Sequence, residues 1–249
     1  MRYAVSGGST GIGAETVNLL MAAGHEVVVY DINAPARDDV GFLSFNLNDA
    51  ASIDAAVAAT SGLFDGLCHI AGIPPREGNT LSCLMINAVG AFRFIDAMMA
   101  HLKPATPVVS VASRAGAGWE QNTDILDRLI ACPPERLEDW VKEHQVSSTL
   151  SYKLAKQALI YWHQLKVAEK IGQHRFITVS PAAVSTAILK DFIRAFGPQA
   201  EQNLARVGRA GTPQEVAEIL SFMLSSSSSW LNGIDIVVDG GMGALNLKV

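Results

Sequence analysis

The chain has 249 residues, of which 49% are hydrophobic and 17% are charged. An α/β domain of about 250 residues often forms one unit, so we expect a single domain over 1–249. The composition excludes a disordered or low-complexity chain. The charged fraction is lower than the roughly 25% of an average soluble domain. This deficit favours a homodimer or homotetramer with a covered surface, and a well-filled monomer is the alternative.

The net charge is −5 and no run of Lys or Arg stands out, so neither nucleic acid nor an anionic membrane surface is the expected partner. No apolar run approaches the roughly 18 residues of a membrane-spanning helix. The N-terminus reaches Gly7 too early for a secretory signal. Cys68, Cys83 and Cys132 form no CxxC pair, which argues against a disulfide framework or a zinc site. We therefore expect a cytoplasmic protein without a metal.

Short apolar runs alternate with helix-length segments along the chain. The runs are rich in Val, Ile and Phe, as strands are, and cover Tyr3–Ser6, Val27–Tyr30, Phe42–Phe45, Gly66–Ile70, Pro107–Val111, Phe176–Val179 and Ile234–Val238. Helices are expected over 12–23, 50–60, about 81–102, 151–171 and 213–224. This alternation predicts an α/β fold in which helices cover both faces of a parallel sheet. Ligands of such sheets bind at the carboxyl ends of the strands.

The first expected strand runs into a glycine-rich segment, Gly7 to Gly13, at which the first helix begins. Glycines permit a tight turn and let backbone N–H groups approach a pyrophosphate at the positive end of a helix. Asp31 ends the second strand, 20 residues after Gly11. A carboxylate there accepts hydrogen bonds from the adenosine ribose and repels a 2′-phosphate, so NAD is favoured over NADP. A structural turn at the loop and a helix cap at Asp31 are the simpler alternatives.

Tyr152 and Lys156 are four residues apart on an expected helix and share one face. A free tyrosine has a pKa of about 10, and a neighbouring ammonium lowers it towards the range of a proton shuttle. A solvated helix face explains the pair as well when it is taken alone. Ser113 follows the strand at 107–111, where its hydroxyl can hold a substrate oxygen. Asn87 lies inside the helix at 81–102, where a buried amide needs a polar partner such as water.

Taken in chain order, these features resemble the short-chain dehydrogenase/reductase family over essentially the whole sequence. The resemblance implies a three-layer Rossmann fold with a seven-stranded parallel sheet in the order 3-2-1-4-5-6-7. It implies a catalytic tetrad at Asn87, Ser113, Tyr152 and Lys156. The cofactor-binding residues that it implies are Gly7, Thr10, Gly11, Ile12, Gly13, Asp31, Asn46, Leu47, Ala71, Gly72, Tyr152, Lys156, Pro181, Val184 and Thr186.

The resemblance also implies a role for each member of the tetrad. Tyr152 takes the alcohol proton, and Lys156 lowers the tyrosine pKa and binds the nicotinamide ribose. Ser113 orients the substrate oxygen and stabilises its developing charge. Asn87 fixes a water that relays the proton outward through Lys156.

Three positions depart from the family pattern. Asn46-Leu47 replaces an acid–hydrophobe pair that flanks adenine, so we expect an altered contact there but not its loss. His69-Ile70 replaces two asparagines ahead of Ala71-Gly72, and we expect His69 to be a packed strand-end residue rather than an extra catalyst. Ala182 replaces a glycine within the segment Pro181–Thr186.

Ser113 and Tyr152 lie 39 residues apart, which is wider than the family's usual spacing and marks an insertion at roughly 117–148. By contrast, Gly72 and Asn87 are only 15 residues apart. This combination resembles the branch of bacterial 3α-hydroxysteroid dehydrogenase/carbonyl reductase, to which coniferyl alcohol dehydrogenase also belongs. The insertion leads directly into the helix at 151–171. We therefore expect it to modify the subunit-pairing surface of that helix, with substrate recognition as the alternative.

Apolar residues recur at Ile188, Phe192 and Phe196, a spacing that places them on one helix face. In this family the segment is a mobile lid over the substrate, although core packing explains the same pattern. We therefore predict an NAD-dependent alcohol dehydrogenase/carbonyl reductase for an apolar steroid, aryl or cyclic alcohol. An aryl alcohol dehydrogenase of the coniferyl type is a narrower version. The rivals are an NADP-dependent reductase and a non-catalytic dinucleotide sensor, which would not need the tetrad.

Overall fold

The computed structural model describes residues 1–246. Its seven parallel strands follow the order β3-β2-β1-β4-β5-β6-β7, which confirms the predicted sheet. The strands are Arg2–Ser6 (β1), Glu26–Asp31 (β2), Gly41–Ser44 (β3), Gly66–His69 (β4), Pro107–Val111 (β5), Arg175–Pro181 (β6) and Ile234–Val238 (β7). The chain crosses from β3 to β4, so the order switches between β1 and β4. A ligand crevice is expected at that switch.

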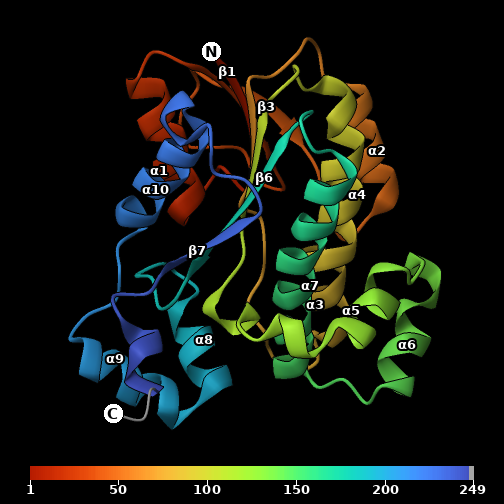
Figure 1. The fold of residues 1–249 in the computed structure, drawn as a ribbon, viewed down its shortest axis with the longest axis vertical. Helices are drawn as coiled ribbons and strands as arrows, with labels where there is room; N and C mark the ends of the chain where they lie inside the picture. Colours follow the sequence, from red (N-terminus) through yellow and green to blue (C-terminus); the bar gives the residue numbers. More distant parts are fainter. Residues whose placement is uncertain (247–249) are drawn as a thin grey trace.

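Helices cover both faces of the sheet (Figure 1). One face carries α1 (Gly11–Ala22) and α10 (Pro213–Leu224), and the other carries α2 (Ala50–Ala58), α4 (Gly90–Met98) and α7 (Ser148–Glu169). Alternate residues of β5 enter the two cores, because successive side chains of a strand point to opposite faces. Val109 and Val111 join the core beneath α1 and α10, whereas Val108 and Ala112, the residue after β5, join the core beneath α7.

The expected helix at 81–102 is interrupted. It consists of α3 (Thr80–Leu84), a π-helical turn over Met85–Val89, α4, and a 3₁₀ turn at Met99–His101. A π turn inside an α-helix often marks a functional site, and this one contains Asn87. By length and composition the segment Thr80–His101 could span a membrane, although 56% of its most apolar window is buried inside the protein. The core helix of a globular protein passes the same test.

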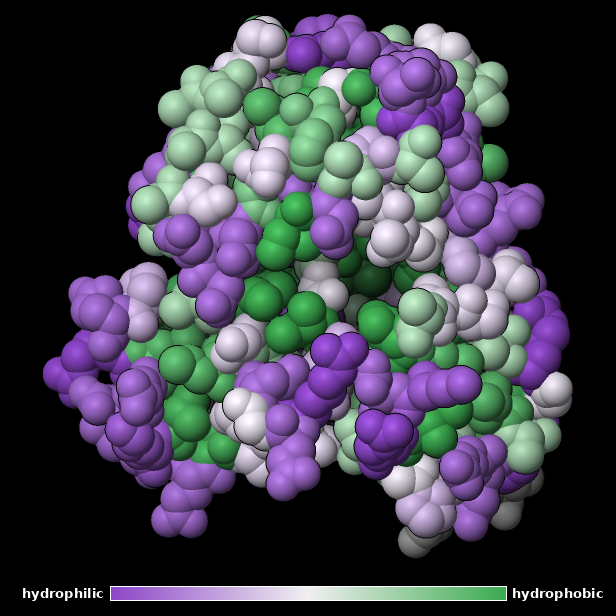
Figure 2. All heavy atoms as spheres, turned by 180° about the vertical axis from the view of Figure 1, so that it is seen from behind, coloured by the Kyte–Doolittle hydropathy of each residue, from purple (hydrophilic) through white to green (hydrophobic). Residues whose placement is uncertain are grey.

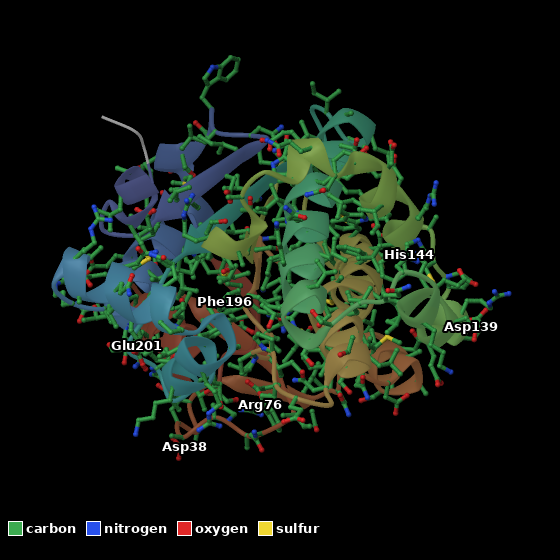
Figure 3. The ribbon with its side chains drawn as sticks, turned by 90° about the horizontal axis from the view of Figure 1, so that it is seen from below. Asp38, Arg76, Asp139, His144, Phe196 and Glu201 are labelled. Carbon is green, nitrogen blue, oxygen red and sulfur yellow. The ribbon has the colours of Figure 1, made fainter. Side chains whose placement is uncertain are left out.

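The insertion forms two short helices, α5 (Thr123–Ile130) and α6 (Leu137–Glu143). The first packs on α7 and the second on α3. The Trp119 ring stacks on Tyr161 of α7 with centroids 5.3 Å apart, and Asn122 donates a hydrogen bond to Gln157 at 3.2 Å. Viewed from below, His144 and Asp139 of this part lie far from Phe196 (Figure 3). The insertion thus covers an outer face of α3 and α7, away from Phe196.

The carboxyl edge of the sheet carries α8 (Leu189–Phe196), α9 (Pro198–Val207) and a final 3₁₀ turn at Met242–Asn246. The apolar repeat at 188, 192 and 196 is therefore helical from 189 onward, as the spacing predicts. Neither α8 nor α9 has a fully buried residue. The two helices lie over the edge of the fold rather than inside its core.

Candidate active site

A cavity of about 430 Å³ lies at the carboxyl ends of the strands. All of the predicted site residues lie in its wall, from the glycine loop and the four tetrad positions to Pro181, Val184 and Thr186. On the face opposite that of Figure 1 the molecule is hollowed, and hydrophobic side chains surround the hollow (Figure 2). The fold thus gathers segments that are far apart in the sequence into one site.

The glycine loop turns sharply at the start of α1. Gly7 and Gly11 have φ angles of +73° and +54°, which other residues adopt only at a cost. A Cβ at Gly13 would overlap the Gly7 carbonyl oxygen, so the loop closes tightly at the start of α1. The N-cap, Thr10, makes no side-chain hydrogen bond to the helix, and the first turn has no acidic residue. The helix N-terminus therefore fits the phosphates of a dinucleotide.

Asp31 is held rigidly at the end of β2. Its two carboxylate oxygens accept hydrogen bonds from the backbone N–H of Ser9 at 3.0 Å and of Asn33 at 3.1 Å. The Ser9 hydroxyl in turn donates to the Asn33 carbonyl at 2.6 Å. These contacts join the glycine loop to the turn after β2 and fix a negative charge beside it. This position fits an adenosine ribose.

Asn46 provides the polar group on the adenine side. Its side-chain oxygen accepts a hydrogen bond from the Asn48 N–H at 2.9 Å, and its own N–H donates to the Ser52 hydroxyl at the same distance. Among the described residues, its amide nitrogen has no recorded acceptor. Leu47 buries its side chain in the core, and the close approach of Gly90 to the Leu47 carbonyl leaves no space for a Cβ at 90.

Asn87 joins the π turn to the segment after β4. Its amide nitrogen donates to the carbonyls of Ile73 at 3.0 Å and Cys83 at 2.9 Å, and its oxygen accepts the Ile73 N–H at 3.2 Å. A Cβ at Gly72 would lie 2.5 Å from that oxygen. The amide therefore satisfies three backbone groups where the helix changes its winding. The water-holding role remains a prediction.

Ser113 and Tyr152 meet across the cavity. Ser113 caps a 3₁₀ turn after β5 by accepting the Ala115 N–H at 3.1 Å, and it lines the cavity together with Tyr152. Tyr152 is only 5% exposed. Burial raises its pKa well above the ordinary range, and the Ser113 hydroxyl partly opposes that rise. The resting side chain is therefore a neutral phenol, which can donate a proton.

Lys156 is buried one helical turn after Tyr152, and burial lowers its pKa to about 8. Its ammonium lies 5.8 Å from the centre of the Tyr152 ring and donates to the Val111 carbonyl at 2.9 Å. Lys156 is not among the causes of the Tyr152 shift, so the lowering of the tyrosine pKa by this ammonium stays a prediction.

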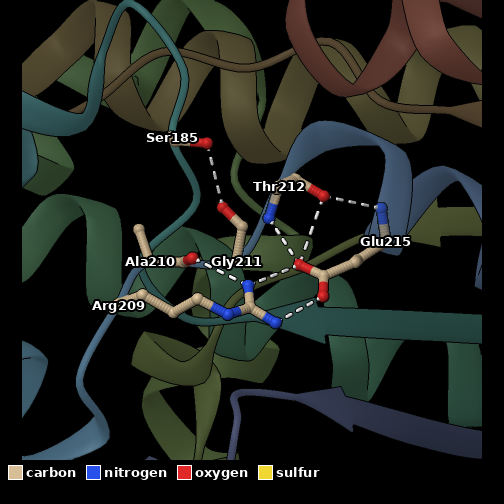
Figure 4. A network of polar contacts seen from close by, with 6 residues as sticks. All are labelled: Ser185, Arg209, Ala210, Gly211, Thr212 and Glu215. Carbon is tan, nitrogen blue, oxygen red and sulfur yellow. Dashed lines mark hydrogen bonds and ion pairs between the residues drawn. The ribbon is translucent and has the colours of Figure 1, made fainter.

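The loop after β6 is held in place by the segment that leads into α10. Val184 pairs with Gly211 in an isolated parallel bridge, and the Ser185 hydroxyl donates to the Gly211 carbonyl at 3.1 Å. Thr212 and Glu215 form a reciprocal capping box at the start of α10, and Arg209 pairs with Glu215 at 2.6 Å (Figure 4). This network fixes the segment that carries Val184 and Thr186 over the glycine loop.

His69 is fully enclosed at the end of β4. Its Nδ1 lies 2.7 Å from the Ser6 hydroxyl, and its ring packs near Phe94. Burial lowers its pKa to about 3, with the Lys156 charge as a second cause. The imidazole is therefore neutral at physiological pH and belongs to the packing, as expected from the sequence.

A second cavity of about 320 Å³ adjoins the first, and the two share Ser113, Ala182 and Phe192. Most of its wall is apolar and comes from α8 and α9 and from Met242. The Phe192 ring meets Tyr152 edge-on at 5.1 Å, so α8 lies against the tyrosine. Arg76, in the segment after β4, pairs with Asp191 of the lid at 2.8 Å.

The sequence is similar to family models and to proteins of known activity. A model of the short chain dehydrogenases matches residues 3–123, and one described as enoyl-(acyl carrier protein) reductase matches residues 140–243. Coniferyl-alcohol dehydrogenase of Pseudomonas sp. strain HR199 is 32% identical over 98% of this chain and 96% of its own length. The chain belongs to the short-chain dehydrogenase/reductase family. The two family models that match are described as a dehydrogenase and a reductase.

Two further relatives support the branch of this short-chain dehydrogenase/reductase. The 3α-hydroxysteroid dehydrogenase/carbonyl reductase of Comamonas testosteroni is 29% identical over 97% of this chain and 96% of its own length. The structure of a 3α-hydroxysteroid dehydrogenase from Pseudomonas sp. B-0831, solved with NADH, superposes with a TM-score of 0.83 at 27% identity, over 98% of both chains. The resemblance to this branch is thereby confirmed.

Sequence reasoning missed several residues of the two cavities. Ile32 and Asn33 line the first cavity, and their place immediately after Asp31 is a signal that could have found them. Ile86 could have been found from its place beside Asn87. Asn203 and Met242 of the second cavity give no local signal, because only the tertiary fold brings α9 and the C-terminal turn to Ser113.

Proposed function

We propose that this protein is an NAD-dependent alcohol dehydrogenase/carbonyl reductase acting on an apolar steroid, aryl or cyclic alcohol. The observation that carries the proposal is the convergence of Ser113, Tyr152 and Lys156 in one cavity with the glycine loop and Asp31. A non-catalytic dinucleotide sensor would need only the glycine loop and Asp31. Tyr152 adds a proton donor to this site, and Ser113 adds a hydroxyl that can hold a substrate oxygen beside it.

The chain manages the proton of the reaction. In the reducing direction, the neutral Tyr152 phenol donates its proton to the carbonyl oxygen, which the Ser113 hydroxyl holds in place. In the oxidising direction, the tyrosine oxygen takes the proton from the alcohol as the phenolate, and the nearby Lys156 ammonium stabilises that charge. The dinucleotide supplies the hydride chemistry when it is bound. Asn87 keeps the π turn and the segment after Gly72 in register with the site.

The preference for NAD rests on the fixed carboxylate of Asp31. Both of its oxygens are oriented by backbone donors, so it cannot turn away from a 2′-phosphate without losing hydrogen bonds. Asp31→Ser should lower kcat/KM with NAD and raise it with NADP. A wild-type enzyme that prefers NADP would contradict the assignment.

The substrate class rests on the apolar second cavity. Leu189, Phe192, Ile193, Phe196 and Leu204 supply large apolar side chains to its wall, next to Ser113. Such a pocket favours a substrate with an apolar ring system over a sugar or a phosphate ester. The names of the relatives, a coniferyl alcohol and a 3α-hydroxysteroid dehydrogenase, support the same class, and an aryl alcohol of the coniferyl type is the narrower candidate.

The deciding experiment follows NADH absorbance after mixing the protein with NAD and a panel of steroid, aryl and cyclic alcohols. NADP is run in parallel, and Tyr152→Phe is the matched control because it removes only the phenolic oxygen. We expect turnover with at least one ring-bearing alcohol and its loss in the variant. Tight NADH binding without turnover across the panel would favour the sensor.

We also propose a cytoplasmic homodimer or homotetramer formed by one chain over 1–249 with its insertion at 117–148. The support is the low charged fraction and the position of α5 and α6 on α7 and α3. These helices cover faces of α7 and of the helical segment at 80–101 through which two subunits could pair, so the insertion should change the assembly. Light scattering of the protein with and without the insertion tests this, and an unchanged tetramer would contradict it.

A further inference from the structure

The wall of the second cavity combines the lid with a turn from the C-terminal end of the described chain. Met242 and Gly243 line this cavity, as do Ser113 and Arg114. The turn follows β7, whereas Ser113 and Arg114 follow β5, and β6 separates the two strands in the sheet. What holds the turn against the catalytic loop therefore determines the shape of the space beside Ser113.

Asp239 organises the turn. One carboxylate oxygen accepts the Gly241 N–H at 2.9 Å, and the other accepts the Gly243 N–H at 2.7 Å. Its side chain is only 10% exposed. A carboxylate that accepts several backbone N–H groups is held in one orientation. The turn and the carboxylate thus form one rigid unit.

Arg114 connects this unit to the catalytic loop. Its Nε lies 3.2 Å from the second Asp239 oxygen, the same atom that accepts the Gly243 N–H. A Cβ at Gly243 would lie 2.8 Å from a terminal nitrogen of Arg114, so the turn packs directly on the guanidinium. Arg114 is the neighbour of Ser113 in the chain, and it lies in the 3₁₀ turn that Ser113 caps.

The charge of Arg114 is already balanced within the protein. Besides Asp239, the guanidinium acts on Asp235 of β7, whose carboxylate accepts the hydroxyls of Thr178 at 2.7 Å and Ser180 at 2.8 Å. An arginine that is already paired with the carboxylate of Asp239 is a poor site for a substrate anion. Its role in the cavity is to hold the wall, not to bind an anionic group.

We propose that the Arg114–Asp239 ion pair determines substrate size by clamping the C-terminal turn against the residue next to Ser113. The inference rests on the proposed function, since it assumes that the second cavity receives the bulk of the alcohol. Without the Arg114–Asp239 ion pair, the turn is no longer attached to the catalytic loop, and Met242 and Gly243 can shift. A long ring-bearing alcohol depends on that wall, whereas a short alcohol held only by Ser113 and Tyr152 does not.

The test compares Arg114→Met, Asp239→Asn and the double variant with wild type on coniferyl alcohol and on allyl alcohol. Each single variant should raise KM for coniferyl alcohol about tenfold, which corresponds to about 1.4 kcal/mol. The double variant should raise it no further, because both changes remove the same interaction. The rise in KM should be much smaller for allyl alcohol than for coniferyl alcohol, and the Kd of NADH should stay within about twofold of wild type.

Arg114→Lys should recover part of the loss, since it keeps the charge but not the planar fork. Asp54→Asn is the matched control, because it breaks the exposed pair of Asp54 with Arg93, and neither residue lines the cavities. Hydrogen exchange over 239–246 gives a readout without catalysis, and it should become faster in Arg114→Met.

The possible outcomes separate the two proposals. Unchanged hydrogen exchange, equal rises in KM for both alcohols, or additive effects in the double variant would each overturn the clamp. Absence of turnover by the wild-type protein would count against the proposed function, while the hydrogen-exchange result would still decide whether Arg114 holds the turn.

Discussion

The ammonium of Lys156 donates a hydrogen bond to the backbone carbonyl of Val111 at 2.9 Å. This contact joins α7 to the end of β5, two residues before Ser113. One side chain thereby sets the distance between the helix that carries Tyr152 and the strand that carries the serine. The ammonium is thereby held in an almost fully buried position, where its charge lowers the stability of the folded protein.

Lys156→Met should stabilise the ligand-free protein at pH 7 while abolishing most of its activity. Burial lowers the lysine pKa from about 10.5 to about 8, so the unfolded chain binds the proton more tightly than the folded one. Removing the buried charge should raise the free energy of unfolding by about 3 kcal/mol. Loss of the hydrogen bond to Val111 should lower it by about 1 kcal/mol, so a net gain remains.

The difference in stability between Lys156→Met and wild type should depend on pH. In the wild-type protein the cost of the buried charge is complete below about pH 8 and disappears as the pH rises towards about 10.5. The advantage of Lys156→Met should therefore shrink over that window. Urea unfolding at pH 7, 9 and 10.5 measures it, and a variant that is less stable than wild type at pH 7 would contradict the argument.

The sequence predicts the strands well because each is a short apolar run between residues that end strands. For β5 and β7 the predicted limits are the observed ones. The resemblance also gives the positions that line the first cavity. The π turn at Asn87 could not be predicted, because the apolar pattern of the segment is that of an ordinary helix. Its winding depends on contacts with Ile73 and Leu47, which are distant in the sequence.

The pKa shifts in the site could not be predicted from the sequence, because they depend on burial in the tertiary structure. Four-residue spacing correctly places Tyr152 and Lys156 on one face, but it does not reveal how deeply both are buried. Burial decides the direction of both pKa shifts. In the same way, Arg114 and Asp239 give no sign of pairing, since β7 reaches the catalytic loop only through the order of the sheet.

Gly116→Ala should reduce kcat by displacing the turn that follows Ser113. A Cβ at Gly116 would lie 2.6 Å from Cδ1 of Ile160 and 3.0 Å from the carbonyl oxygen of Lys156. The backbone oxygen cannot yield as a side chain can, so the turn moves away from α7. A loss of about tenfold to a hundredfold in kcat is expected for a small misplacement of a reacting group.

The second substitution Ile160→Val provides the matched control for Gly116→Ala. It removes the methyl group that meets the new Cβ, and it should recover part of kcat in the double variant. By itself it should cost about 1 kcal/mol of stability and leave kcat near the wild-type value. If Gly116→Ala retains full activity with the same substrate, the close packing of this turn is not required for catalysis.

Asn87→Ala should destabilise the protein as well as slow it. The amide satisfies the N–H and carbonyl of Ile73 and the carbonyl of Cys83, and alanine leaves all three without this partner. The expected loss is about 3 kcal/mol, since each unsatisfied buried group costs about 1 to 3 kcal/mol and part of the segment relaxes. Asn122→Ala, in the insertion, removes a more exposed amide and should cost less. Unchanged stability of Asn87→Ala with slowed turnover would instead indicate that the residue acts only by holding a water.

His69→Ala should lower stability without altering the pH dependence of turnover. The imidazole is 1% exposed, and burial holds its pKa at about 3, so it does not titrate between pH 5 and 9. Loss of its contact with Phe94 and of the Ser6 hydrogen bond should cost about 2 to 3 kcal/mol. Ser6→Ala serves as the control, because it removes the hydrogen bond but keeps the ring and should cost only about 1 kcal/mol. The measurement is kcat/KM across that pH range together with urea unfolding. A shift of the profile in His69→Ala that Ser6→Ala does not reproduce would show that the histidine takes part in proton transfer.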